Sequence, residues 1–262
     1  MSTLYNQGTM NTKELETYIK ERLELEAFGS IDISLNGLQV GSPHKEIQKV
    51  VCAVDASLET FKKAQQEGAD AIFVHHGLFW GKSIAITSSH YQRVAFLINN
   101  DISLFAAHLP LDAHPTLGNN GVMASLLHLE DITPFGSYHG LNIGYKGVSK
   151  KGLSVDEIIN ILGFSPEKGL NVLPFGNKEI KRIAIVSGGA SKEVLQAIDI
   201  GYDAYITGEA SHEMYNVCKE EGITMICGGH YQSEVFGVQA FSAALTDECH
   251  LESSFIDLPT SL

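Results

Sequence analysis

The sequence predicts an α/β protein made of two β-α-β-α-β-α halves, with mostly parallel or mixed sheets and helices packed on them. Two observations predict this fold. From residue 48 onward, short apolar runs alternate with amphipathic segments, and the same order of elements returns from residue 181. Such alternation implies a largely parallel sheet covered by helices. The composition, 44% hydrophobic and 19% charged, is that of an ordinary globular protein.

The expected elements follow in this order. An amphipathic helix at 11–28 begins at Asn11, and Glu14 completes a capping box with it. An Asn-Gly turn lies at 36–37. The first half then has strands at 49–56, 69–76 and 101–108, and helices at 57–68, 88–100 and 119–130. The second half repeats the pattern from residue 181, with a helix at 211–222, a strand at 223–229 and a helix from 230.

These elements predict the domain organisation. We expect a first α/β half at 11–130, a connecting region at 131–180 and a second α/β half at 181–262. The connecting region contains a helix at 154–163, with Ser154 and Glu157 in a capping box. When the two halves are aligned at a constant offset of 133 residues, Asp70 falls on Asp203. The third strands correspond at a shorter offset, which pairs His108 with His230 and Asp112 with Glu234. The matching order and ends of the elements favour a duplication.

Charge and composition exclude several functional classes. The formal net charge of −13 argues against a nucleic-acid groove, which requires a basic stripe. No apolar run approaches the length of a membrane span, and the first residues lack the apolar core of a signal peptide. The four cysteines are far apart without a C-x-x-C pair, so we expect reduced thiols in a cytoplasmic protein. Met10 is an alternative start that would make residues 1–9 a disordered leader.

Polar side chains gather at the carboxyl ends of the predicted strands, where open α/β sheets bind ligands. Two adjacent histidines end the second strand and face one site only if the strand stops and the backbone turns there. The residues at the three strand ends are His75, His76, His108, Asp112, His114, His230 and Glu234. Each motif alone has an ordinary structural explanation, such as a cap, a turn or a solvated pair. Their coincidence at strand ends favours a metal site.

The number of donors predicts two metal ions. Imidazoles with carboxylates suit zinc, iron, manganese, cobalt or nickel, and six or seven donors exceed what one open site needs. Two ions about 3.5–4 Å apart with one bridging carboxylate fit the set, and adjacent histidines would then serve different ions. We assign the bridge to Glu234. Glu209 is a further residue that would face the pocket, and the "SGGASK" turn at 187–192 is a weaker candidate for a phosphate.

The motifs "NGLQVG", "VHHGLFW", "HLPLDAHPTLGNN", "ITGE" and "GHYQSE" together resemble the Nif-three-like family, whose members are labelled GTP cyclohydrolase I type-two homologues. The resemblance runs from about residue 11 to the C-terminus and matches the short form of the family. It implies a toroidal homohexamer with a dinuclear metal centre in each subunit. Carried over by motif, the ligands are His75, His76, Asp112, His230 and Glu234. The resemblance leaves His108 either a ligand or a proton carrier.

Two functions from different classes remain open. The first is a metal-dependent hydrolase acting on a small molecule, with GTP ring opening as the activity that the resemblance implies. Attack at C8 of the purine would then require a residue such as His108 to give a proton to the leaving nitrogen. The second is a non-catalytic metal-binding assembly or adaptor that uses the ring as a platform. Ligand type leaves the native metal open among several first-row ions.

Overall fold

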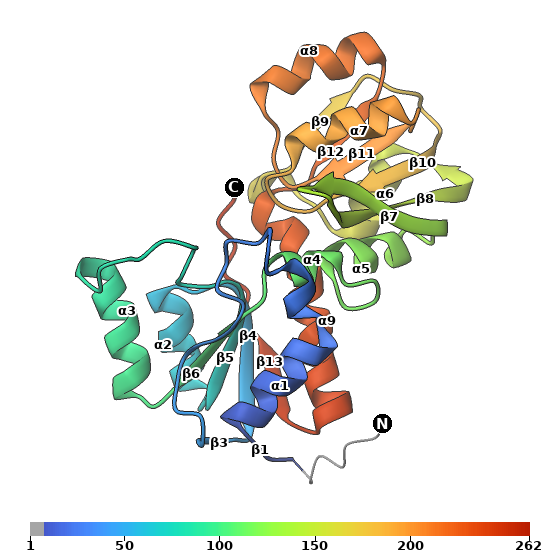
Figure 1. Ribbon diagram of the computed structural model, residues 1–262. Coiled ribbons are helices and arrows are strands. Elements are labelled where there is room, and N and C mark those ends of the chain that lie inside the picture. The colour runs from blue at the N-terminus through green and yellow to red at the C-terminus, as the bar shows by residue number, and fades with distance from the viewer. Residues whose placement is uncertain (1–7) are drawn as a thin grey trace. The chain divides into compact units, whose positions relative to one another are not determined.

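The computed structural model describes residues 8–262, which form two compact units (Figure 1). The first contains residues 8–111 and 238–258, and the second contains residues 112–237 and 259–262. Each is built on a mixed sheet with helices, which confirms the predicted fold class. Residues 1–7 of the leader expected from a start at Met10 lie outside the described residues. Within residues 8–262, no helix has the length and apolar character needed to cross a bilayer.

The first unit has a sheet that orders its described strands as β13-β4-β5-β6-β2. β2 runs antiparallel to β6, and the remaining neighbours pair in parallel. β4 and β5 are buried along almost their whole length, as expected for parallel strands with both faces covered. The strands are β2 (Gly37–Val40), β4 (Lys49–Asp55), β5 (Ala71–His76), β6 (Ser103–Ala106) and β13 (Glu252–Phe255), and a small pair is formed by β1 (Met10–Asn11) and β3 (Glu46–Ile47).

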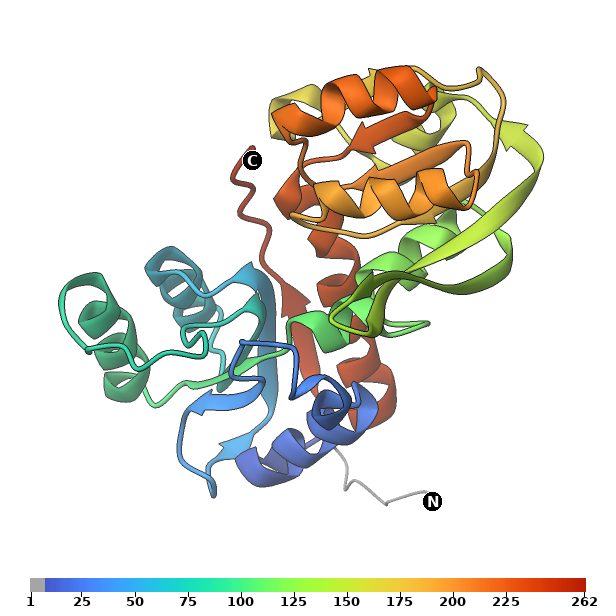
Figure 2. The same cartoon turned by 45° about the horizontal axis from the view of Figure 1, so that its top comes forward.

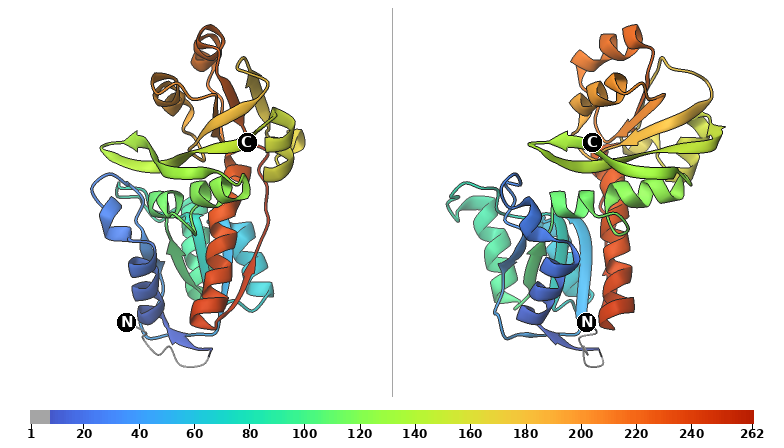
Figure 3. Two further views of the ribbon diagram at one scale, coloured as in Figure 1. Left: turned by 90° about the vertical axis from the view of Figure 1, so that its right-hand side faces the viewer. Right: turned by 45° about the vertical axis from the view of Figure 1, so that its right-hand side comes forward.

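Helices cover both faces of this sheet. α2 (Leu58–Gln66) and α3 (Ser88–Asn99) lie on one face, and α1 (Thr12–Arg22) lies with the later turns of α9 (His230–Cys249) on the other (Figure 3). The ring of Phe73 in β5 packs against Phe241 of α9, with centroids 4.2 Å apart. The capping box predicted at the start of α1 is confirmed, because the side chain of Asn11 accepts from the Glu14 amide and Glu14 accepts in return.

The second unit has a larger sheet, with its described strands in the order β7-β8-β10-β11-β12-β9. β10, β11 and β12 are parallel, and antiparallel neighbours flank them on both sides. The strands are β7 (Glu130–Tyr138), β8 (Leu141–Leu153), β9 (Asn171–Pro174), β10 (Ile180–Ile185), β11 (Ala204–Thr207) and β12 (Thr224–Cys227).

Its helices also form two layers. α7 (Val194–Asp199) and α8 (His212–Glu221) lie on one face of the sheet (Figure 2). Apolar residues of α5 (Asn119–Leu126) and α6 (Val155–Leu162) share a buried core with β10, β11 and β12. The capping box predicted for α6 is confirmed, with Ser154 as N-cap and Glu157 as its partner.

The units divide the chain differently from the expected segments 11–130, 131–180 and 181–262. Residues 131–180 contribute β7, β8, β9 and α6 to the second unit, so this region is part of a domain core and sheet. Residues 238–258 complete the first unit with most of α9 and β13. The physical reason is weak patterning: most of β7 is exposed, so the strand lacks the apolar alternation by which a sequence identifies strands.

The duplication is visible in strand register. Val50 pairs with Ala71 in the first unit, and Ile183 pairs with Ala204 in the second, which are the positions that the predicted constant offset relates. The alignment of the third strands was wrong by one residue. Ala71 pairs with Ser103 and Ala204 pairs with Thr224, so the position of His108 corresponds to Gly229 and that of Leu109 to His230. The length of a tight turn leaves no signal in the sequence, so the sequence alone does not reveal this one-residue shift.

Candidate metal centre

Three histidines of the first unit form a cluster. His75 and His76 end β5, and His108 follows β6, the parallel neighbour of β5. Each offers a ring nitrogen, and these atoms lie within 4.8 Å of one another. The ring centroids of His75 and His76 are 4.6 Å apart. Adjacent residues can share a site here because β5 ends at His76, as the sequence predicted for this pair.

The protein orients each of these rings through Nδ1. A metal would therefore be bound through Nε2, since Nδ1 faces an oxygen of the protein in every case. Partners of this kind fix the tautomer and ring angle of metal-binding histidines. The Nδ1 contacts are His75 with the carbonyl oxygen of Ala107 at 3.0 Å, His76 with Oδ1 of Asp55 at 2.8 Å, and His108 with Oδ1 of Asp32 at 3.0 Å.

A fourth histidine lies in the second unit at the start of α9. Nε2 of His230 is 3.3 Å from Oε1 of Glu234, one helical turn later, and Nδ1 is 2.5 Å from Oε1 of Glu209. Burial lowers the pKa of His230, but the hydrogen bonds and charges of Glu234 and Glu209 outweigh it and raise that pKa to about 9. A cation that binds here must displace a proton at neutral pH, as is usual for imidazole ligands.

The second unit also holds two buried carboxylates close together. Asp112 is 6% exposed and Glu234 is 3% exposed, and ligand oxygens of the two lie within 4.8 Å of each other. Oδ1 of Asp112 accepts hydrogen bonds from Asn119 at 2.9 Å and from the Ser187 hydroxyl at 2.7 Å. Two buried carboxylates at this distance repel each other, and a cation between them offsets the repulsion. The residues therefore fit a divalent metal ion.

Glycines make room for these carboxylates. Gly188 has a φ of +67°, and a Cβ there would lie 2.3 Å from Oε1 of Glu234. A Cβ on Gly208 would meet the hydroxyl of Ser233 at 2.7 Å. Two amides of the "SGG" turn are already bonded to side chains of the protein. The amide of Ser187 donates to Oδ1 of Asn120 at 2.7 Å, and the amide of Gly188 donates to the hydroxyl of Ser233 at 2.9 Å. This turn thus leaves room for Glu234, and because two of its amides are already bonded, its geometry does not favour the phosphate interpretation.

Sequence reasoning missed two orienting residues, Asp32 and Asp55. Asp55 ends β4, so the rule that ligands gather at carboxyl ends of strands would have identified it. Asp32 carries no such signal. Glu209, which was expected near the pocket, lies against His230. His114 caps its own turn, with Nδ1 accepting from the amides of Thr116 and Leu117.

Burial by itself would raise the pKa of Asp32. The hydrogen bond and charge of His108, with the hydrogen bonds from Asn36 and Ser34, have the larger effect, so the pKa lies below its usual range. Asp32 is therefore an anion when the protein is folded at neutral pH. Beside it, the ring of Trp80 stands edge-on to His108, with centroids 5.0 Å apart, and it is the single tryptophan of the sequence.

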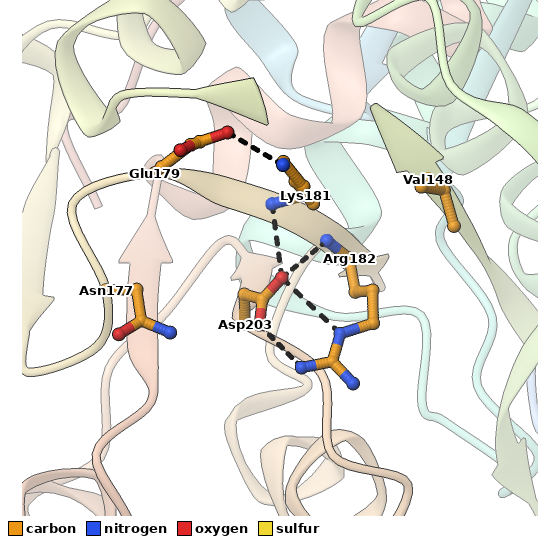
Figure 4. Close-up of a pocket in the computed structure, with 6 residues that line it drawn as sticks. All are labelled: Val148, Asn177, Glu179, Lys181, Arg182 and Asp203. Carbon is orange, nitrogen blue, oxygen red and sulfur yellow. Dashed lines mark hydrogen bonds and ion pairs between the residues drawn. The ribbon is translucent and has the colours of Figure 1, made fainter. Parts of the chain in front are cut away.

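A surface hollow of about 660 Å³ lies in the second unit at the other ends of the strands (Figure 4). Its charged side chains pair with each other: Arg182 with Asp203 at 2.8 Å and Lys181 with Glu179 at 2.9 Å. Asp203 also accepts from the backbone amides of Lys181 and Arg182. This hollow contains none of the predicted site residues, and its ion pairs anchor the start of β10.

Comparison with known proteins identifies the family to which this chain is similar. Residues 10–261 match the family described as Duf34/NIF3 (NGG1p interacting factor 3), which confirms the resemblance drawn from the motifs. An Archaeoglobus fulgidus protein named GTP cyclohydrolase 1 type 2 homolog is 41% identical over 253 residues, covering 97% of this chain and 100% of the relative. A Deinococcus radiodurans protein of the same name is 38% identical over 261 residues, covering 100% and 98%. The crystal structure of TTHA1606 from Thermus thermophilus matches with a TM-score of 0.86 at 36% identity, covering 97% of this chain and 100% of that one.

Proposed function

Because the chain belongs to the Duf34/NIF3 family, we propose that it is a metal-dependent hydrolase whose donors hold two divalent ions in one centre. The observation that carries this proposal is the buried pair Asp112 and Glu234, whose mutual repulsion a divalent cation would offset. The ligands would be His75, His76, Asp112, His230 and Glu234. When bound, such ions supply the Lewis acidity for hydrolysis at a polarised carbon or phosphorus.

The protein's own residues have three roles in this scheme. Glu234 would help to hold both ions and would offset part of their charge, a role that suits its length and its place one turn after His230. Asp55 and Glu209 hold the rings of His76 and His230 through Nδ1. His108 moves a proton through Nε2, since its Nδ1 faces Asp32.

For the substrate we propose a small molecule, with a purine nucleotide such as GTP as the first candidate, because the relatives are named GTP cyclohydrolase 1 type 2 homologs. Opening the five-membered ring adds water at C8 and breaks the bond from C8 to the ring nitrogen. His108 would accept a proton from the attacking water and return it to the leaving nitrogen. We also propose a homohexamer in the cytoplasm, as the resemblance and the four free, buried cysteines favour.

Turnover of the metal-loaded protein tests the function. Wild type and His76→Ala would be compared on GTP and a panel of small phosphoesters, and metal content would be measured by elemental analysis. We expect about two ions per chain and metal-dependent turnover that the variant loses. Fluorescence of Trp80 gives a second readout, because a paramagnetic ion such as Co²⁺ near His108 should quench it.

Tight metal binding without turnover of any compound would favour the adaptor, and a single ion in a closed tetrahedral site would contradict the two-metal centre. Light scattering tests the assembly, since a monomer mass at micromolar concentration contradicts the hexamer.

A further inference from the structure

Asp32 is a buried carboxylate with four hydrogen-bond partners, all in the first unit. Its side chain is 1% exposed. Oδ1 accepts from the amide of Ser34 at 2.9 Å and lies 3.0 Å from Nδ1 of His108. Oδ2 accepts from Nδ2 of Asn36 at 2.9 Å and from the amide of Leu109 at 3.0 Å. Each oxygen thus faces two nitrogens.

Three of these nitrogens can only donate. The amides of Ser34 and Leu109 are backbone N–H groups, and the orientation of Asn36 is set because its Oδ1 accepts from the amide of His108 at 2.9 Å. Asn36 must therefore turn its NH₂ group to Asp32. These donors stabilise the ionised carboxylate, which accepts at both oxygens and is the form that the lowered pKa of Asp32 favours at neutral pH. Facing an ionised carboxylate, which can only accept, the fourth nitrogen, Nδ1 of His108, also donates.

We propose that Asp32 is a positioning residue that holds the His108 ring with its proton on Nδ1 and its lone pair on Nε2. In the proposed function, on which this role rests, His108 then meets the centre as a base or as a ligand. Because Nδ1 faces Asp32, Nε2 is the ring nitrogen left to serve the centre, and His75, His76 and His108 offer ligand nitrogens within 4.8 Å of one another. A carboxylate behind an imidazole sets the tautomer in the same way in known catalytic triads and metal sites.

The segment around Asn36 also holds the turn after β5, through Gln39. Oε1 of Gln39 accepts from the amide of Leu78 at 2.7 Å, and its Nε2 donates to the carbonyl of Leu35 at 2.8 Å. A Cβ on Gly77 would lie 2.2 Å from this amide nitrogen, so the turn needs glycine where Gln39 approaches. The "NGLQVG" motif is thereby explained, since Asn36 supports the turn that carries His108 and Gln39 supports the turn that follows the histidine pair.

The tautomer is measured directly by ¹⁵N NMR of full-length protein labelled at histidine and kept metal-free with a chelator. The His108→Gln variant assigns the signal by its absence. We expect wild-type His108 to carry its proton on Nδ1. In Asp32→Asn the new NH₂ group should turn to His108, because that side opposes one obligate donor and the other side opposes two. The proton of His108 should then move to Nε2, and the affinity for Co²⁺ should fall about 10–100-fold.

Asp70→Asn is the matched control. Asp70 also accepts from two backbone amides, those of Gln48 and Lys49, but at the opposite ends of the strands. It should leave the His108 signal and the Co²⁺ affinity unchanged. A wild-type proton on Nε2 would overturn the inference even if Asp32→Asn did not fold, and so would an Asp32→Asn protein with an unmoved proton. The expected tautomers without turnover or metal binding would reject the proposed function and leave the role of Asp32 intact.

Discussion

The two units share a backbone scheme but differ in what their strand ends carry. In both, an aspartate before the second strand accepts the two amides at the start of the preceding strand, Asp70 in the first unit and Asp203 in the second. At the other end, the first unit presents three imidazoles, two of them held from behind by carboxylates and one by a backbone carbonyl. The second presents two carboxylates and one histidine in space left by glycines. Duplication therefore preserved the supports of the sheet, while the turns, which contribute little to the core, acquired different chemistry.

The difference in donors assigns complementary tasks. Neutral imidazoles of the first unit contribute no charge to a bound cation, whereas Asp112 and Glu234 contribute two negative charges. Two adjacent dications repel strongly and need anionic ligands. The carboxylates of the second unit should therefore contribute more to the affinity for a cation than the imidazoles of the first.

The largest effect is expected in the core of the first unit. Phe73→Ala removes a fully buried ring that packs on Phe241, and should lower the free energy of unfolding by about 3–5 kcal/mol. Ile206→Val, at the equivalent position of the second unit, should cost about 0.5–1.5 kcal/mol. Urea denaturation followed by circular dichroism measures both. Equal losses of unfolding free energy in the two variants would contradict the larger contribution assigned to Phe73.

The next effect concerns charge at the centre. Glu234→Gln keeps the volume but removes the anion, and should weaken the binding of at least one ion by about 100-fold or more. Glu209→Gln is the control, since Glu209 is half exposed and touches the ring of His230 from behind. Metal content of the two variants is compared at one pH and one chelator concentration. If both retain the same content, the bridge is assigned to the wrong residue.

A smaller effect tests the shared scheme. Asp203→Asn and Asp70→Asn each weaken the acceptor of two backbone amides, at a cost of about 1–3 kcal/mol. Burial raises the pKa of Asp203, but hydrogen bonds from the side chain and amide of Arg182 and from the amide of Lys181 outweigh it and lower that pKa.

The lowered pKa of Asp203 makes its contribution to stability depend on pH. Because the folded-state pKa of Asp203 lies below the unfolded value of about 3.9, its stabilisation is complete above that pH and is lost as the pH falls through the folded-state value. The difference in Tm between wild type and Asp203→Asn should therefore narrow as the pH falls from 6 to 3. A difference in Tm that stays constant over this range would contradict the assignment.

The smallest effect should be equal in the two units. Gly68 and Gly201 follow α2 and α7 with φ of +75° and +70°, and neither has a close obstacle to a Cβ. Replacing either by alanine should cost about 1 kcal/mol through the left-handed backbone alone. Matched thermal melts measure the pair. A much larger loss at one position would mean that the duplicated helix ends are not equivalent.

Much of the candidate centre was predictable from local signals. His75, His76, Asp112, His230 and Glu234 stand where apolar runs stop, and strand ends in α/β sheets are where ligands bind. Asp55 follows the same rule and was overlooked. Asp32 obeys no local rule, because it meets His108 across 76 residues of chain and only the packing of its loop brings the two together.

By itself the sequence determined the elements with strong periodicity, the helix caps, the duplication and the residue types at the strand ends, because these depend on neighbours within one or two turns of chain. Tertiary structure alone decided which unit each segment joins, as for the exposed β7 and for β13, whose partner β4 lies far earlier in the chain. It also decided the one-residue shift at His108 and the oxygen behind each imidazole. Those choices rest on hydrogen bonds between residues far apart in the chain, whose geometry exists only once the sheets have formed.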